Sequence, residues 1–178
     1  CTIAWIAMSV EMLRLTGNSI VADEIELSTL NSVMGMHSAS GRWVTYDTPM
    51  DGVRRASAHS IVCHSREGTP ELNCCSVNGH RGLGMVGDWA LMHQGDSGIT
   101  LNYYGPSTMA ARLSSGRRVE FSQDTTYPVD GHVKLSVHPS RPTRFRLNLR
   151  IPYWSARTRL HVNGEPIENV TSGSYCAL

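Results

Sequence analysis

The sequence predicts an α+β protein with more than one domain, in which helical hairpins come first and an antiparallel β-sandwich follows. Apolar side chains recur at helical spacing in the first part, whereas from Gly98 onward apolar and polar residues alternate with a period of two. Charge changes at the same place. Residues 1–97 hold six arginines and no lysine against ten acidic residues, and residues 98–178 hold nine arginines and one lysine against five. We therefore expect two units, residues 1–96 and 97–178.

Composition excludes several classes of protein. The chain has 178 residues, of which 40% are hydrophobic and 17% charged, and its net charge is +1. An intrinsically disordered chain would combine low hydrophobicity with high net charge. No run approaches the roughly 18 apolar residues of a membrane span. The near-neutral charge argues against a nucleic-acid binder. We therefore expect neither nucleic acid nor a membrane among its partners.

Three helices are predicted in the first part. Residues 2–15 place a set of apolar side chains on one face: Ile3, Ile6, Ala7, Val10 and Leu13. Gly17 then favours a helix end, and a second helix is expected over residues 19–33. A third runs from about Val77 to His93, with Ser76 as its N-cap. Its buried side is expected to carry Leu83, Val86, Trp89 and Ala90, and its four glycines indicate close packing against its backbone.

Strands dominate the second part. Apart from a short strand at residues 42–46 and a long loop over residues 51–71, the candidate strands are Ile99–Tyr103, Met109–Leu113, Val119–Phe121, Val133–Val137, Phe145–Ile151 and Arg159–Val162. Within Phe145–Ile151, apolar residues alternate with polar ones, which predicts one dry face and one wet face. We expect Arg144, Arg146 and Arg150 on the wet face. Asn163-Gly164 is a tight hairpin signal.

The cysteine pair Cys74-Cys75 is the most informative chemical feature. Two adjacent thiols at the start of a helix can point toward one metal ion. The helix dipole and the unpaired N–H groups there also favour the thiolate form, which is the form that binds a metal. Zinc prefers sulfur and four ligands. Packing is the alternative, since cysteine is among the most buried residue types. Cys63 and Cys176 are expected to be packing residues, and His59, His64 and His80 are expected to be solvated.

Five pieces of the chain, taken in order, resemble one enzyme family. They are CTIAWIAMSVEMLRLTGN, VADEIELSTLNSVMG, WVTYDTPM, ELNCCSVNGHRGLGMVGDWALM and LNLRIPYWSARTRLHVNGE. Together they resemble glycoside hydrolase family 127, which comprises bacterial β-L-arabinofuranosidases and relatives that include family 146. The resemblance implies the C-terminal part of an (α/α)6 catalytic barrel over residues 1–96, followed by the β-sandwich over residues 97–178.

The resemblance also implies a site. Members cleave terminal β-L-arabinofuranose with retention, using a cysteine nucleophile held in a zinc site of one glutamate and three cysteines. Matched onto this chain, Cys74 is the nucleophile, and Cys1, Cys74 and Cys75 are zinc ligands. The fourth ligand and the acid/base glutamate would lie upstream of Cys1. Glu26 and Tyr46 would contact the sugar. Members often carry proline after the cysteine pair, where this chain has Ser76, so a related sugar is also considered.

Two other functions stay open at this point. One is a carbohydrate-binding or assembly module in which the cysteine pair only packs, and the other is a thiol redox protein using Cys74 and Cys75. For the enzyme we expect a small-molecule or oligosaccharide substrate, with a homodimer as a further hypothesis. Reduced thiols favour the bacterial cytoplasm over the periplasm. The chain opens at Cys1 without methionine, so we expect an internal segment that does not turn over substrate alone.

Overall fold

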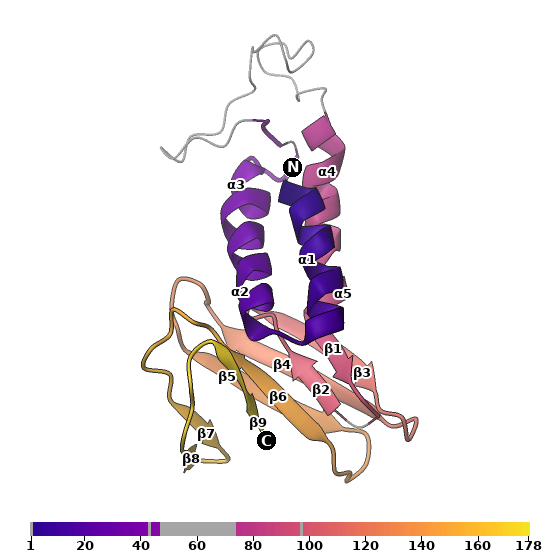
Figure 1. Ribbon diagram of the computed structural model, residues 1–178, viewed down its shortest axis with the longest axis vertical. Helices are drawn as coiled ribbons and strands as arrows, with labels where there is room; N and C mark the ends of the chain where they lie inside the picture. The colour runs from indigo at the N-terminus through magenta and orange to yellow at the C-terminus, as the bar shows by residue number, and fades with distance from the viewer. Residues whose placement is uncertain (1, 43, 47–73, 97) are drawn as a thin grey trace. The chain divides into compact units, whose positions relative to one another are not determined.

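A computed structural model describes residues 2–42, 44–46, 74–96 and 98–178 (Figure 1). The chain divides into two compact units, one formed by residues 1–16 and 24–86 and the other by residues 17–23 and 87–178. The first is helical and the second is built mainly of strands, which confirms the mixed α+β class. No helix in the described part of the chain is long and apolar enough to cross a membrane.

The first two predicted helices are present. Helix α1 spans Thr2–Thr16, and Gly17 then adopts the left-handed backbone (φ +60°) that ends a helix. Helix α2 (Ser19–Ser28) continues through a π-helical turn, η1 (Thr29–Val33), into the short α3 (Met34–Met36). The apolar residues of the helical unit that are buried are Ile3, Ile6, Val10, Leu13, Ile25, Val33, Met36, Val44 and Met85. The first four of these residues lie on α1 and confirm its predicted inner face. Ala7, which was predicted on the same face, is only half-buried.

The third predicted helix begins earlier and ends earlier than expected. Helix α4 spans Cys74–Gly84 and α5 spans Val86–Trp89, so Ser76 lies inside the first turn and is not the cap. The four residues after Ala90 form strand β1 (Leu91–Gln94), because they pair with the next strand across a turn at Gly95 (φ +58°). Leu83 was predicted on the buried side but is 37% exposed.

Two of the four glycines in this region allow a close approach between helices. A Cβ on Gly82 would lie 2.6 Å from Ile3 Cδ1 and 2.9 Å from both methyl groups of Val33, whereas a Cβ on Gly84 would meet nothing within 4 Å. A Cβ on Gly79 would likewise meet Val44 Cγ1 at 2.8 Å. The predicted close packing is therefore confirmed at Gly79 and Gly82.

The strand predicted at residues 42–46 is not formed by its described members. Val44 makes a single antiparallel bridge with His37, and the Thr45 N–H donates to the Met36 carbonyl oxygen. The segment is held mainly by packing, because Val44 is buried against the side of α4 that carries Gly79. The loop predicted over residues 51–71 lies outside the described residues.

The described residues of the second unit form three small sheets (Figure 1). The strands that follow β1 are β2 (Gly98–Leu101), β3 (Ser107–Arg112), β4 (Arg118–Thr125), β5 (Val133–Pro139), β6 (Arg146–Ile151), β7 (Leu160–Val162), β8 (Glu165–Ile167) and β9 (Ser174–Ala177). Their orders are β1-β2-β6-β9, β3-β4-β5 and β7-β8. The first sheet is mixed, because β2 and β6 run parallel, and this corrects the expectation of purely antiparallel strands.

One hydrophobic cluster joins the two larger sheets. Its buried members are Ile99, Leu101, Leu113, Val119, Phe121, Leu147 and Leu149. The dry face predicted for Phe145–Ile151 is therefore confirmed. The hairpin signal is confirmed as well, since β7 and β8 pair antiparallel around Asn163 (φ +53°) and Gly164 (φ +94°).

The wet face predicted for the polar residues of the same strand is wrong at Asn148, which is 5% exposed, and at Arg150. Arg144 and Arg146 are exposed, but the Arg150 side chain is completely buried. Its Nη1 donates to Asp23 Oδ1 at 2.5 Å, and its Nε donates to the Asn102 carbonyl oxygen at 2.7 Å. A tertiary partner 127 residues earlier in the chain therefore turns an apparently solvated position into a core position.

Candidate active site

The cysteine pair lies in the first turn of α4. Cys74 is the first residue of the helix and is exposed, and Cys75 follows it and is half-buried. The Asn78 side-chain amide donates to the Cys74 carbonyl oxygen at 2.9 Å, which fixes this turn of the helix. Both cysteines are reduced thiols, as is Cys176 on β9. An exposed sulfur at a helix start is accessible to a substrate and to a metal ion.

The start of α1 and the start of α4 lie at the same end of the helical unit (Figure 1). Gly82 packs on Ile3 near the beginning of α1, and Gly79 packs on Met36 at the end of α3. From Gly79 the helix extends a further five residues back to Cys74, or about 7.5 Å at 1.5 Å per residue. This end therefore holds the cysteine pair and the turn of α1 that follows residue 1.

Tyr46 belongs to this same end. It lies two residues after Val44, whose methyl group meets the Cβ position of Gly79 on α4, and it is 42% exposed. A tyrosine hydroxyl can donate to or accept from a sugar hydroxyl. The sequence predicted Tyr46 within a strand, whereas it lies in a bend.

Glu26 lies much farther from the cysteine pair. Val33 packs on Gly82, so these two residues lie at the same level along the helix axis. Glu26 stands seven residues before Val33, and Cys74 stands eight residues before Gly82. Because the two segments run antiparallel, Glu26 and Cys74 lie on opposite sides of that level, and the two offsets add. At about 1.5 Å per residue the two positions are separated by about 20 Å along the helix axis. Glu26 is also only 1% exposed, so it is not the surface carboxylate that one interpretation of the sequence suggested.

The donor set suits zinc where it can be described. Two adjacent sulfur donors, one accessible and one half-buried, are the ligand type that zinc prefers. Cys1, the third predicted sulfur ligand, and Cys63 lie outside the described residues. Among the described residues no three side chains of His, Cys, Asp or Glu gather at one point. The zinc site therefore stays a prediction, and the two described thiols are compatible with it.

Of the histidines considered from the sequence, only His80 lies in the described part. It is exposed on α4, and its ring contacts that of His37 at the end of α3, with 5.2 Å between the ring centroids. Sequence reasoning missed His37, because no local pattern links two histidines that stand 43 positions apart. It missed Asp23 for the same reason.

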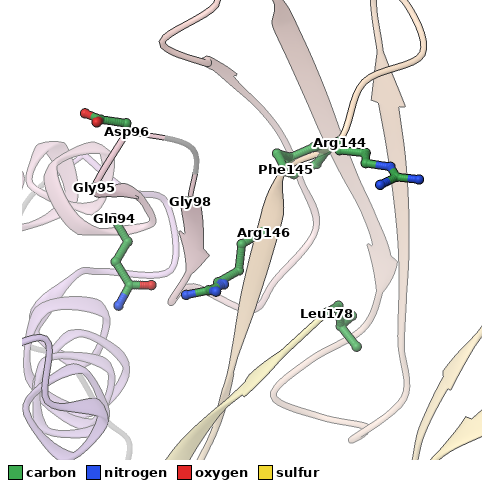
Figure 2. Close-up of a pocket in the computed structure, with 8 residues that line it drawn as sticks. All are labelled: Gln94, Gly95, Asp96, Gly98, Arg144, Phe145, Arg146 and Leu178. Atoms are coloured by element: carbon green, nitrogen blue, oxygen red, sulfur yellow. The ribbon is translucent and has the colours of Figure 1, made fainter.

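An open pocket of about 650 Å³ lies in the β unit, and none of the residues that line it is a predicted site residue (Figure 2). Gln94, Gly95, Asp96 and Gly98 line one side, and Arg144, Phe145, Arg146 and Leu178 line the rest. The Gln94 side chain accepts a hydrogen bond from the Asn148 amide. In Figure 2 the Arg146 side chain extends toward Gln94, whereas Arg144 extends to the opposite side of its strand.

Two family models match the chain. The model described as the catalytic domain of β-L-arabinofuranosidase of family GH127 matches residues 1–88. The model described as the middle domain of the same family matches residues 98–178. No protein in the curated set matches the chain.

Solved structures show the same relationship. A glycoside hydrolase is 27% identical with a TM-score of 0.78, and the match covers 99% of this chain and 29% of that one. A GH127 β-L-arabinofuranosidase from Geobacillus stearothermophilus T6 is 25% identical with a TM-score of 0.75, covering 99% and 28%. A further GH127 β-arabinofuranosidase, at 20% identity, TM-score 0.78 and coverage of 99% and 29%, supports the fold alone. The chain thus spans less than a third of the length of each structure.

Proposed function

Because the chain belongs to glycoside hydrolase family 127, we propose that it supplies the nucleophile of a retaining glycosidase that releases terminal β-L-arabinofuranose or a related sugar. The observation that carries the proposal is the accessible Cys74 thiol in the first turn of α4, within the segment that the catalytic-domain model matches. The activity belongs to a gene product that contains this segment, since the similar enzymes are more than three times as long.

In the proposed reaction, the Cys74 thiolate attacks the anomeric carbon of the sugar. The C–S bond forms as the glycosidic C–O bond breaks, and the leaving oxygen takes a proton from a glutamic acid outside these 178 residues. Water, deprotonated by the same carboxylate, then attacks the anomeric carbon, and sulfur leaves as thiolate. Two displacements at one carbon retain its configuration.

We propose zinc as the cofactor, with Cys1, Cys74 and Cys75 as its sulfur ligands and a glutamate upstream as the fourth. When bound, zinc holds the cysteine sulfurs as thiolates at neutral pH. The accessible Cys74 is then the sulfur that meets the substrate, and the half-buried Cys75 anchors the site.

Tyr46 is proposed as a sugar contact, supported by its exposure at the cysteine end of the helical unit. Glu26 was predicted as a second contact, but its burial and its distance of about 20 Å along the axis favour a structural role. We further propose that residues 1–96 form part of an (α/α)6 barrel and residues 97–178 part of a β-sandwich. The family supports an oligosaccharide substrate. A homodimer and a bacterial cytoplasmic location remain proposals.

The experiment is hydrolysis of 4-nitrophenyl β-L-arabinofuranoside by the gene product that contains this segment, followed by proton NMR of the first sugar formed. We expect the β anomer first. We also expect about one zinc per chain, lost in Cys75→Ser, and no turnover in Cys74→Ala. A well-folded protein that lacks zinc and leaves the glycoside intact would contradict the proposal and favour a binding module. Normal activity from the 178 residues alone would contradict the assignment of the acid/base outside them.

A further inference from the structure

The chain contains two Asn-Gly sequences, which the structure places in very different surroundings. Asn78-Gly79 lies in α4, and Asn163-Gly164 forms the turn between β7 and β8. An asparagine side chain can lose its amide when the backbone nitrogen of the next residue attacks the amide carbon. Glycine favours this attack because it has no side chain that hinders the approach. The attack also requires that the asparagine side chain turn toward that nitrogen and that the nitrogen be free of a hydrogen bond.

The Asn163-Gly164 turn meets these requirements. Both residues are exposed, and their φ angles of +53° and +94° are those of a type I′ turn. The strand register pairs Val162 with Glu165, so the two residues between them take no part in the β7–β8 ladder. No described residue forms a hydrogen bond with the Asn163 side chain. Its amide carbon is therefore open to attack.

The hairpin that carries this turn is also easy to open. Strands β7 and β8 have three residues each, and among the described strands they pair only with each other. A two-stranded hairpin of this kind is marginally stable by itself. Leu160 anchors its base against the hydrophobic cluster, whereas all residues from His161 to Pro166 are exposed. The turn can therefore leave its type I′ geometry at a small cost in free energy.

Asn78-Gly79 is held in several ways. The Asn78 side-chain amide donates to the Cys74 carbonyl oxygen at 2.9 Å, which directs the side chain toward the preceding turn of α4. The Gly79 N–H lies within the hydrogen-bond ladder of the same helix. Gly79 is buried, and a Cβ there would lie 2.8 Å from Val44 Cγ1 and 2.9 Å from Met36 Sδ. Attack at Asn78 therefore requires α4 to unwind and to separate from these two side chains.

We infer that Asn163 is a site of spontaneous deamidation in the folded protein, whereas Asn78 is protected. The Gly164 nitrogen gives up its proton and forms a bond to Asn163 Cγ. The bond between Cγ and the amide nitrogen breaks, and that nitrogen leaves with the proton as ammonia. Water then opens the cyclic imide at either carbonyl, which gives aspartate or isoaspartate. Both products add a negative charge near Glu165, and isoaspartate also lengthens the main chain within the turn.

The test compares the two asparagines in the same protein. The gene product that contains this segment is incubated at mildly alkaline pH, either folded or in urea, and digested with trypsin at intervals. Peptide mass spectrometry measures the conversion of amide to acid, and fragmentation separates Asn163 from Asn169 on the same peptide. In the folded protein we expect Asn163 to convert at least about tenfold faster than Asn78, because opening of α4 costs more free energy than opening of the hairpin. In urea the two rates become similar.

Asn163→Gly is the matched control. It removes the reacting amide and keeps a residue that accepts the positive φ of the turn. Labelling with an isoaspartyl methyltransferase should therefore detect isoaspartate in the aged native protein and lose that signal in Asn163→Gly. Equal rates at Asn163 and Asn78 in the folded protein, or conversion of Asn163 only in urea, would overturn the inference.

Discussion

Arg150 and Asp23 form an ion pair in which both side chains are completely excluded from solvent. Asp23 also accepts a hydrogen bond from the Tyr153 N–H at 3.0 Å, so both of its oxygens are engaged. The Arg150 guanidinium carbon lies 5.3 Å from the Tyr104 ring centroid, within the range of a cation–π contact. The pair attaches the first turns of α2 to strand β6.

Removal of one member of this pair is expected to destabilise the protein strongly. Arg150→Met leaves the Asp23 carboxylate buried without its cation, which costs about 3–5 kcal/mol in comparable cases. Urea unfolding gives the free energy. Arg146→Met on the same strand, at an exposed position, should change it by less than about 0.5 kcal/mol. Equal effects of the two variants would show that the buried pair does not stabilise the fold.

Tyr175 gives a prediction for alkaline pH. Its hydroxyl donates to Asn102 Oδ1 at 2.6 Å, and burial raises the pKa of Tyr175 far above its ordinary value, with Arg150 opposing the shift and Asp23 adding to it. Above pH about 10 the unfolded chain loses this proton while the folded protein keeps it. The free energy of unfolding therefore falls as pH rises beyond that value.

Tyr175→Phe removes this proton. The stability difference between the native protein and Tyr175→Phe should shrink by up to about 1.4 kcal/mol per pH unit above pH about 10. Urea unfolding of both proteins across that range measures it. A difference that stays constant with pH would show that Tyr175 titrates normally in the folded protein.

The glycines of α4 provide a matched pair of substitutions. Gly82→Ala places a methyl group 2.6 Å from Ile3 Cδ1, and overpacking of this kind costs about 1–3 kcal/mol. Gly84→Ala meets nothing within 4 Å and is expected to be neutral, or to stabilise by up to about 1 kcal/mol through helix propensity. Thermal unfolding of the two variants should move in opposite directions or differ by several degrees. Equal melting temperatures would contradict the close approach of α4 to α1.

Much of the fold could be predicted because its signals are local. The stripe of α1, the end of that helix at Gly17 and the hairpin at Asn163-Gly164 all depend on neighbouring residues, and the structure contains each of them. The resemblance to family 127 was also predictable from short motifs, and the matching family models confirm it.

The remainder depended on residues that are distant in sequence. The alternation in β6 indicated a solvated Arg150, and only its contact with Asp23 makes that position part of the core. The extended third helix was wrong because β1 finds a partner in β2, and no helical period can reveal such a pairing. The His37–His80 pair exists only because α3 and α4 meet. The zinc-ligand roles of Cys1 and of the one glutamate expected upstream stay predictions.

Tyr46 tests the proposed sugar contact independently of the thiols. Tyr46→Phe removes one hydroxyl from an exposed side chain and keeps the aromatic ring, and urea unfolding of the variant reports any change in stability separately from the kinetics. If the hydroxyl binds the sugar, we expect kcat/KM to fall by about tenfold, corresponding to about 1.4 kcal/mol. Steady-state kinetics on the arabinofuranoside measure this, and unchanged kinetics would exclude the contact.

The identity of the nucleophile can be measured directly by peptide mass spectrometry. The gene product that contains this segment is mixed with an activated β-L-arabinofuranoside, quenched rapidly in acid and digested. The proposal predicts one pentosyl group on the peptide that carries Cys74 and Cys75, with fragmentation assigning it to Cys74, and none in Cys74→Ala. A pentosyl group on a carboxylate, or an active enzyme whose Cys74 is never modified, would contradict it.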